Sequence, residues 1–482
     1  RDLRMSRGLG DVYKRQGFSN KGMITVALLF LVSEGIRQSG TLGQVIKKLL
    51  PQGKTTVFKA QLRILPSVAF ISAFLNNTPV VVIFAPIIKH WAKSVNLPAT
   101  KFLIPLSYVT ILGGICTLIG TSTNLVVHGM ILEAGFEGFS MFELGKVGIF
   151  IAIAGIIYIF LFSKRLLPDA RPDTAVPDEE VEEGEKLHRV EAVLGARFPG
   201  INKKLKDFNF QRHYGAEVKE IKTRNGQRFV TNLDDVVLHE GDTLVVMADD
   251  TFIPTWGESS VFVLLTNGNE PDTTGKKKRW FALLLLVLMI VGATVGELPV
   301  TKEMFPDIKL DMFFFVSITT IIMAWTNLFP ARKYTKYISW DILITIACAF
   351  AISKAMVNSG VADSVAKFII GLSDDYGPHV LLAMVFIITN LFTELITNNA
   401  AAALAFPLAL SISAQLGVSP TPFFVVICMA ASASFSTPIG YQTNLIVQGI
   451  GNYKFTDFVR IGLPLNIITF LISIILIPLI WN

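Results

Sequence analysis

Residues 436–444 read STPIGYQTN and residues 116–124 read CTLIGTSTN, so two polar stretches share a G-x-x-T-N ending. The same spacing separates Ile24-Thr25 from Ile344-Thr345, and nearly the same spacing separates the dipeptide Asn76-Asn77 from Asn398-Asn399. Two distant regions that share a register in this way predict an internal repeat.

The surroundings of both stretches are strongly apolar. Hydrophobic residues make up 51% of the 482 residues and charged residues only 17%, against about 25% in soluble domains. Segments such as Trp280–Ala293 and Ile461–Trp481 carry almost no charge. The composition predicts a protein of the lipid bilayer with several membrane spans and excludes an ordinary soluble fold. Half of the net charge of +6 comes from positions 1–16, so nucleic-acid binding is not indicated.

Each half shows the same order of segments. An apolar helix is followed by a polar Asn-Asn tip between two apolar arms, a helix interrupted by Gly and Thr, and a closing span. Corresponding interrupted segments in two halves are typical of transporters built from repeats. We expect the first repeat at residues 17–165 and the second at 279–482. Phe281–Leu298 and Met312–Phe329 have no counterpart in the first half, so we expect that repeat to be truncated.

Residues 1–16 stand apart from this organisation. They show no hydrophobic periodicity and no apolar core of a signal peptide. Their end, DVYKRQ, resembles the translated read-through of a sequencing adapter. We expect this segment to be a non-native leader, the alternative being a short basic arm.

Residues 166–278 are polar and predict a small soluble α/β insert. A strand is expected at Thr243–Ala248, and an Asn225-Gly226 turn is expected between strands at Ala216–Lys222 and Phe229–Thr231. Basic clusters at Lys164-Arg165 and Lys276–Arg279 flank it at the membrane edge. By the positive-inside rule the insert is cytoplasmic and the chain is a multi-pass inner-membrane protein.

The two Asn-Asn tips are the first candidate site. Asn76-Asn77-Thr78 and Thr397-Asn398-Asn399 interrupt apolar sequence, and such breaks are tolerated in a membrane where they line a cavity. Their carbonyl, amide and hydroxyl oxygens are hard neutral ligands that suit a sodium ion. The alternative is helix capping, because Asn is a good N-cap and Pro79 fits a first helical turn.

The Gly- and Thr-rich stretches are the second candidate site. Glycine and proline permit unwinding, and the half-helix that begins after each break directs its positive dipole end and free N–H groups at the gap. An anion at the middle of the bilayer is thereby bound without a buried arginine. The alternative is a flexible kink that binds nothing.

The sequence gives little support for a metal site or a catalytic site. The six histidines form no metal-ligand spacing, and the sequence holds no nucleophile elbow, Walker or Rossmann motif. Cys116, Cys348 and Cys428 lie far apart in apolar segments. Glu34, Lys354 and Glu394 are intramembrane charges that act as proton relays or, alternatively, snorkel and cap. We therefore expect no enzymatic activity.

The tips, the stretch from Gly113 to Thr121 and the stretch from Thr437 to Asn444 resemble the divalent anion:sodium symporter family of the ion transporter superfamily. The resemblance covers about residues 17–165 and 279–482. It implies an all-α polytopic membrane protein with inverted repeats, re-entrant hairpins and broken helices, which forms a homodimer and moves as an elevator. Asn76, Thr397 and Asn399 depart from the Ser-Asn-Thr pattern of the family tips, which alters the groups that face the substrate.

The resemblance also implies which residues bind. Around the anionic substrate it implies Asn76, Asn77, Thr78, Thr121, Ser122, Thr397, Asn398, Asn399, Thr437, Pro438 and Thr443. Around two sodium ions it implies Asn77, Gly120, Asn124, Asn398, Gly440 and Asn444.

The insert, between about residues 187 and 256, resembles the TrkA-type C-terminal regulatory domain of potassium-transport systems. The residues that carry this resemblance are Arg197–Gly200, Phe210–Gly215 and Gly241–Val246. Such domains dimerise and bind a small regulatory ligand, which the sequence does not identify. A purely structural role is the alternative.

These observations favour a secondary active transporter of a divalent oxyanion, sulfate first and a C4 dicarboxylate second, driven by sodium as the coupling ion. A proton-coupled or exporting member of the superfamily, with Glu394 as relay, is the first alternative. A sensor that binds the anion without transporting it is the second.

Overall fold

The computed structural model describes residues 21–169, 187–195, 197–223, 227–249, 252–256, 261–266, 276–305, 308–371 and 378–481. The expected leader at 1–16 and the expected Asn225-Gly226 turn lie outside these residues, as do residues 170–186 and 372–377. The described part is mostly helical, with one small sheet.

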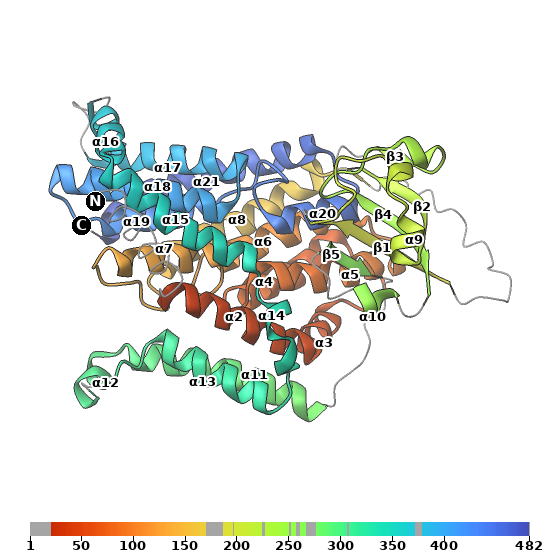
Figure 1. Ribbon diagram of the computed structural model, residues 1–482, viewed down its shortest axis with the longest axis horizontal. Coiled ribbons are helices and arrows are strands. Elements are labelled where there is room, and N and C mark those ends of the chain that lie inside the picture. Colours follow the sequence, from red (N-terminus) through yellow and green to blue (C-terminus); the bar gives the residue numbers. More distant parts are fainter. Residues whose placement is uncertain are drawn as a thin grey trace, which may run out of the picture.

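Two sets of helices follow one another in the same order, one before and one after the insert (Figure 1). The first set is α2 Lys21–Gln38, α3 Thr41–Leu49, α4 Val57–Ser72, α5 Asn77–Ser94, α6 Leu103–Gly114, α7 Ser122–Glu133 and α8 Gly145–Leu166. The second set is α15 Trp340–Asn358, α16 Val361–Gly371, α17 Pro378–Leu395, α18 Asn398–Leu416, α19 Thr421–Ser432, α20 Gln442–Gly451 and α21 Phe455–Ile480. The repeat seen in the sequence is thus matched by a repeat of elements.

The closing helices of the two sets lie side by side and antiparallel. Tyr158 in α8 donates to the Ile461 carbonyl near the start of α21 at 3.1 Å, while Trp481, after the end of α21, donates to Glu143, before the start of α8, at 3.1 Å. These two equivalent helices therefore run in opposite directions.

Four helices of the described chain are apolar and long enough to cross a membrane, namely α8, α18, α21 and residues 277–296 of α11. The helices α11 Lys276–Gly296, α12 Pro299–Met304, α13 Met312–Trp325 and α14 Tyr334–Tyr337 lie between insert and second set, and α11 and α13 form a pair along one side (Figure 1). Leu284, Leu288, Ile321 and Trp325 are exposed on this pair, as expected of a surface that faces lipid.

Side chains of the local sequence fix several helix starts. The side chains of Thr56, Asp311 and Thr397 accept backbone N–H groups at the starts of α4, α13 and α18. These bonds satisfy donors that a helix start leaves without an internal partner. At α18 the capping alternative is thus realised by Thr397, whereas Asn76 at the start of α5 makes no side-chain cap.

The insert folds as a five-stranded antiparallel sheet at one end of the helices (Figure 1). Its strands are β1 His188–Leu194, β2 Glu217–Lys222, β3 Arg228–Phe229, β4 Thr243–Ala248 and β5 Phe262–Thr266, in the order β3-β2-β4-β1-β5. Two short helices, α9 Phe210–Tyr214 and α10 Phe252–Trp256, accompany it. Short 3₁₀ turns occur at Ala99–Lys101, Leu205–Asp207, Leu233–Asp235 and Ala331–Lys333. The strand expected at 243–248 is β4, and an aromatic cluster around Phe198 fills the core beneath.

Candidate functional site

In each broken helix an asparagine side chain donates hydrogen bonds to backbone carbonyls of the interruption. Between α6 and α7, Asn124 Nδ2 donates to the Thr117 carbonyl at 2.9 Å. Between α19 and α20, Asn444 Nδ2 donates to the carbonyls of Ser434 at 2.9 Å and Thr437 at 3.1 Å. The two asparagines occupy equivalent repeat positions and both are fully buried. Each one satisfies carbonyls that the interruption of the helix leaves without a helical partner.

The loops lie against the hairpin tips so closely that only glycine fits. A Cβ on Gly120 would lie 2.9 Å from the Ala73 carbonyl oxygen, and a Cβ on Gly440 would lie closer still to the Thr393 carbonyl oxygen. Both separations are shorter than a carbon–oxygen contact allows. The absence of a side chain at these two glycines therefore brings each loop against the backbone of its own hairpin.

Each hairpin tip also contacts the broken helix of the other half. Thr78 Oγ1 lies 3.2 Å from Gln442 Oε1 at the start of α20, and Ser122 Oγ at the start of α7 donates to Asn399 Oδ1 at 3.1 Å. Asn398 Nδ2 donates to Thr123 Oγ1 at 2.8 Å. The structure thus brings four segments together, two tips and two loops.

Tyr441 lies at the centre of this meeting point. Its hydroxyl is 2.7 Å from the Asn77 side-chain amide and 2.7 Å from Thr121 Oγ1. The Asn77 orientation that satisfies all its neighbours donates its nitrogen to the Thr110 and Gly120 carbonyls and accepts the tyrosine hydroxyl on its oxygen. Tyr441 was not among the expected site residues. Its size within a stretch of small residues is the one sequence signal that marks it.

Some expected residues face elsewhere. Thr443, expected near substrate, accepts from Ser107 of α6 at 2.9 Å, and the same serine hydroxyl lies 2.6 Å from Asn444 Oδ1. Thr397 caps α18, and Pro438 is buried within its loop. Ser107 escaped the sequence reasoning because its repeat counterpart is Ile427, so no polar pair points to it.

The two broken helices differ in the surroundings of the asparagine side-chain oxygen. Asn444 Oδ1 has Ser107 beside it, whereas the equivalent Asn124 Oδ1 is buried and has no hydrogen-bond partner within the part of the chain that the structure describes. A buried carbonyl oxygen without a donor is unfavourable unless a ligand meets it. Its chemistry suits a hard cation such as sodium, and Gly120 and Asn77 lie in the same loop and tip.

Glu394 is bound into the second loop. Its carboxylate accepts from the Ser436 backbone N–H at 2.9 Å and from Asn466 Nδ2 of α21 at 2.7 Å, and its carbonyl accepts from Thr437 Oγ1 at 3.1 Å. These bonds anchor the loop to α17 and α21. Glu34 forms an ion pair with Arg37 of its own helix at 2.6 Å.

The electrostatics of the meeting point come from backbone and neutral side chains. Helices α5, α7, α18 and α20 all begin there, so four positive dipole ends face it. The bonds described above between tips and loops involve no lysine or arginine. Among the described residues no group of three or more His, Cys, Asp or Glu side chains could hold a metal ion. The contacts between the tips and the loops are thus made by neutral side chains, while the Glu394 carboxylate accepts from the backbone of the second loop.

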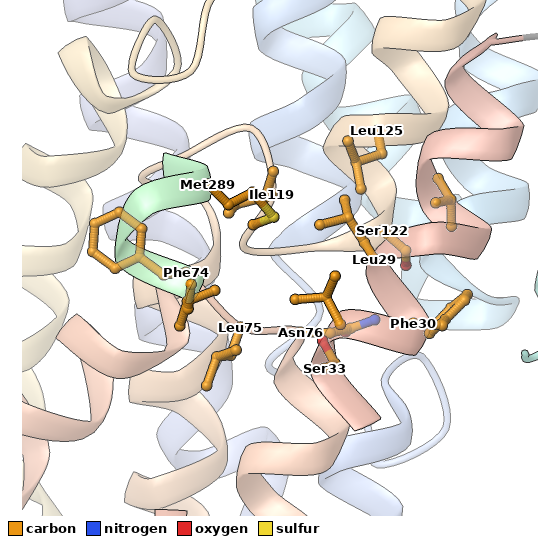
Figure 2. A pocket seen from close by; sticks show the side chains of 13 residues that line it. Leu29, Phe30, Ser33, Phe74, Leu75, Asn76, Ile119, Ser122, Leu125 and Met289 are labelled. Carbon is orange, nitrogen blue, oxygen red and sulfur yellow. The ribbon is translucent and has the colours of Figure 1, made fainter. Parts of the chain in front are cut away.

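A pocket opens beside the first tip, between α2, α7 and α11 (Figure 2). Asn76, Ser122 and Ser33 are its polar side chains, and the rest of its lining is apolar, including Phe30 and Met289. Asn76 thus lies at the border between the polar meeting point and an apolar wall.

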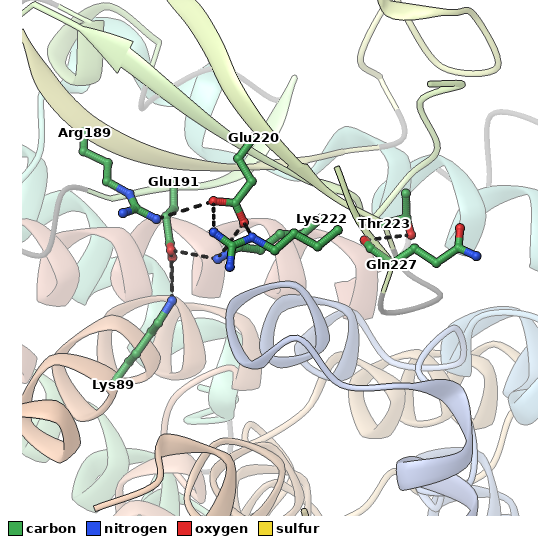
Figure 3. A network of polar contacts seen from close by, with 8 residues as sticks. Lys89, Arg189, Glu191, Glu220, Lys222, Thr223 and Gln227 are labelled. Carbon is green, nitrogen blue, oxygen red and sulfur yellow. Dashed lines mark hydrogen bonds and ion pairs between the residues drawn. The ribbon is translucent and has the colours of Figure 1, made fainter. Parts of the chain in front are cut away.

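The insert contacts the far ends of two helices that begin at the meeting point (Figure 3). Lys89 of α5 donates to both oxygens of Glu191 on β1, at 2.9 and 3.0 Å, and Lys222 of β2 lies 3.4 Å from the same carboxylate. Burial raises the pKa of Glu191, but the neighbouring lysines outweigh this effect and lower it to about 2. The end of α20 also lies close to β1, since a Cβ added to Gly449 would lie 3.5 Å from Val193 Cγ2.

Comparison with known proteins places these features in a family. The model of the CitMHS citrate transporters matches residues 13–417 and 308–482. An uncharacterized transporter of Synechocystis is 30% identical over 97% of this chain and 90% of its own length. Sodium/sulfate cotransporter 2 of Chlamydomonas reinhardtii is 31% identical over 58% of this chain and 31% of its own length. The crystal structure of the Alcanivorax borkumensis YdaH transporter shares the fold, with a TM-score of 0.55 and 12% identity over 97% of this chain and 86% of that one.

Proposed function

The chain belongs to the CitMHS citrate transporter family, and on this premise we propose that it carries a divalent oxyanion across the membrane in symport with sodium. Membership confirms the expectation of a membrane transporter rather than an enzyme. Sulfate is our first substrate and a C4 dicarboxylate the second. A relative named as a sodium/sulfate cotransporter supports both the ion and the anion.

The observation that carries the proposal is the convergence of both tips and both loops through direct side-chain contacts. The bonds Asn398–Thr123, Ser122–Asn399 and Thr78–Gln442 all join one half to the other. An anion at this point meets hydroxyl and amide donors and four helix starts, and sodium offsets the cost of its desolvation. The expected substrate residues at the tips and at Thr121 and Ser122 fit this role, while Thr443 fits it less well because it faces Ser107.

We place the first sodium ion at Asn77, Gly120 and Asn124, and the second at Asn398, Gly440 and Asn444. Support for the first is the Asn124 oxygen, which has no partner among the described residues. The second lacks such an atom, because Asn444 Oδ1 is next to Ser107. We therefore expect the first position to bind sodium more tightly.

The antiparallel α8 and α21 support inverted repeats, because equivalent closing helices then cross the bilayer in opposite directions. On this basis we propose elevator-type motion of the repeats in a homodimer, in the inner membrane. The basic residues at both ends of the insert support its cytoplasmic location. A TrkA-type regulatory role of the insert, with a small ligand, belongs to the same proposal.

The test is uptake of radiolabelled sulfate into proteoliposomes with and without an inward sodium gradient. We expect uptake only with sodium, and Asn124→Ala should raise the sodium concentration needed for half-maximal uptake about tenfold or more. The control is Asn358→Ala, which changes an exposed asparagine at the end of α15 and should transport normally.

Three other outcomes redirect the proposal. Sodium-driven uptake of succinate without sulfate uptake would exchange the order of the substrates. Flux that follows pH and ignores sodium would favour the proton-coupled alternative. Saturable sulfate binding without flux would favour the sensor.

A further inference from the structure

Tyr441 occupies the repeat position that Thr121 occupies in the first half. Each residue directly precedes a half-helix, α20 or α7, and their backbones are alike, with φ −135° and ψ 129° at Tyr441 and φ −141° and ψ 146° at Thr121. The two side chains therefore leave equivalent backbones in equivalent directions. They differ in length by an aromatic ring.

The two counterparts touch. The Tyr441 hydroxyl lies 2.7 Å from Thr121 Oγ1, and the tyrosine side chain is only 5% exposed. Repeat counterparts of this kind meet only near the axis that relates the two halves. The phenol ring therefore extends to the midpoint between the four segments. The threonine side chain is shorter and does not occupy that midpoint.

The ring makes the site asymmetric, because the second half places a phenol where the first half has a threonine. A dicarboxylate carries two charged groups separated by a hydrocarbon chain, so it needs donors on both sides of the midpoint with open space between them. A tetrahedral oxyanion is compact and needs one cluster of donors. The Tyr441 hydroxyl, with Asn77 and Thr121 beside it, forms one neutral polar cluster.

From this geometry we propose that Tyr441 is the specificity-determining residue of the transporter, selecting a compact oxyanion such as sulfate and excluding a dicarboxylate. The inference rests on the proposed function. The ring excludes the longer substrate by its volume, while the hydroxyl, which donates to Asn77 in this structure, turns its proton to the compact substrate when that substrate binds.

Two substitutions separate these effects. Tyr441→Thr gives both halves the threonine of the first half. We expect the ratio of sulfate to succinate uptake to fall at least tenfold when the two anions compete in the same proteoliposomes. Tyr441→Phe keeps the ring and removes one hydrogen bond. It should raise the KM for sulfate about tenfold without admitting succinate. Tyr158→Phe is the matched control, since it removes a buried hydroxyl that donates to Ile461 at 3.1 Å, and both ratio and KM should stay unchanged.

The outcomes are distinguishable from those that test the function. If the unaltered protein takes up neither anion, the proposed function fails. If it prefers sulfate and Tyr441→Thr keeps that preference, the inference is overturned while the function stands. Should Tyr441→Thr not fold, as judged by size-exclusion chromatography, Tyr441→Phe decides, and an unchanged KM for sulfate overturns the inference.

Discussion

Replacing Lys89 by methionine should loosen the insert from the transport helices. The Lys89 ammonium donates to both carboxylate oxygens of Glu191, and both side chains are largely buried, at 21% and 16% exposure. A fall of the Glu191 pKa from 4.5 to about 2 corresponds to about 3 kcal/mol in favour of the charged carboxylate. Lys222 supplies part of this stabilisation at 3.4 Å, so we assign about 1–2 kcal/mol to Lys89.

Hydrogen exchange of α20 measures this quantity. A Cβ added to Gly449 of α20 would lie 2.5 Å from Thr243 Oγ1, so the end of this helix is close to the insert and undocking exposes it. A loss of about 1–2 kcal/mol makes the opened state roughly 5 to 30 times more populated, and the amides of residues 446–451 should exchange faster by the same factor.

The pH dependence has a definite sign. Because Lys89, together with Lys222 and Arg189 of the insert, lowers the pKa of Glu191, the contribution of the carboxylate is complete above about pH 4.5 and is lost as the pH falls toward about 2. The unaltered protein should therefore lose protection of α20 on acidification through this window, and Lys89→Met should lose less. Lys219→Met is the control, because it removes a half-exposed surface pair with Glu217 that should contribute little. Equal exchange of α20 in Lys89→Met and Lys219→Met would mean that the Lys89–Glu191 pair does not hold the insert on the helices.

Three further predictions concern the meeting point. Gly440→Ala should lower the melting temperature by several degrees, because the new Cβ overlaps a backbone oxygen of α17, whereas Gly371→Ala, with nothing within 4 Å, should melt normally. Ser107→Ala should lower the free energy of unfolding by about 1–2 kcal/mol, because Asn444 loses a buried hydrogen-bond partner. A change near zero would mean that this contact does not stabilise the fold. Glu394→Gln should leave the pH profile of sodium-driven uptake unchanged if the side chain anchors its loop, while a relay would lose pH-dependent flux.

The repeat and its broken helices could be predicted because they depend on residues that are close together in the sequence. Gly120 and Gly440, each followed in the same register by Asn124 or Asn444, mark the same loop twice, and helices begin where the stretches predicted. The two tips nevertheless differ in the residue at which the following helix begins. Helix α5 begins at the second asparagine of its dipeptide, whereas α18 begins at the first.

Contacts between distant segments could not be predicted in this way. Ser107 has an apolar counterpart, so the repeat pattern conceals it. Lys89 and Glu191 belong to different parts of the chain, and their pairing depends on how the sheet docks on α5. The central place of Tyr441 follows from the approach of two halves, which no local spacing encodes.

Internal symmetry explains how the meeting point forms, and departures from it explain how two similar halves acquire different tasks. Asn124 and Asn444 hold equivalent loops with the same nitrogen, yet one oxygen has Ser107 beside it and the other is buried without a partner in the described chain. Thr121 and Tyr441 leave equivalent backbones, yet only the tyrosine reaches the midpoint. Both differences involve polar groups near Asn77, which contacts the tyrosine hydroxyl and belongs to the proposed first sodium position. In the proposed symporter this single amide would link the two ligands, and the link would give their coupled transport a physical basis.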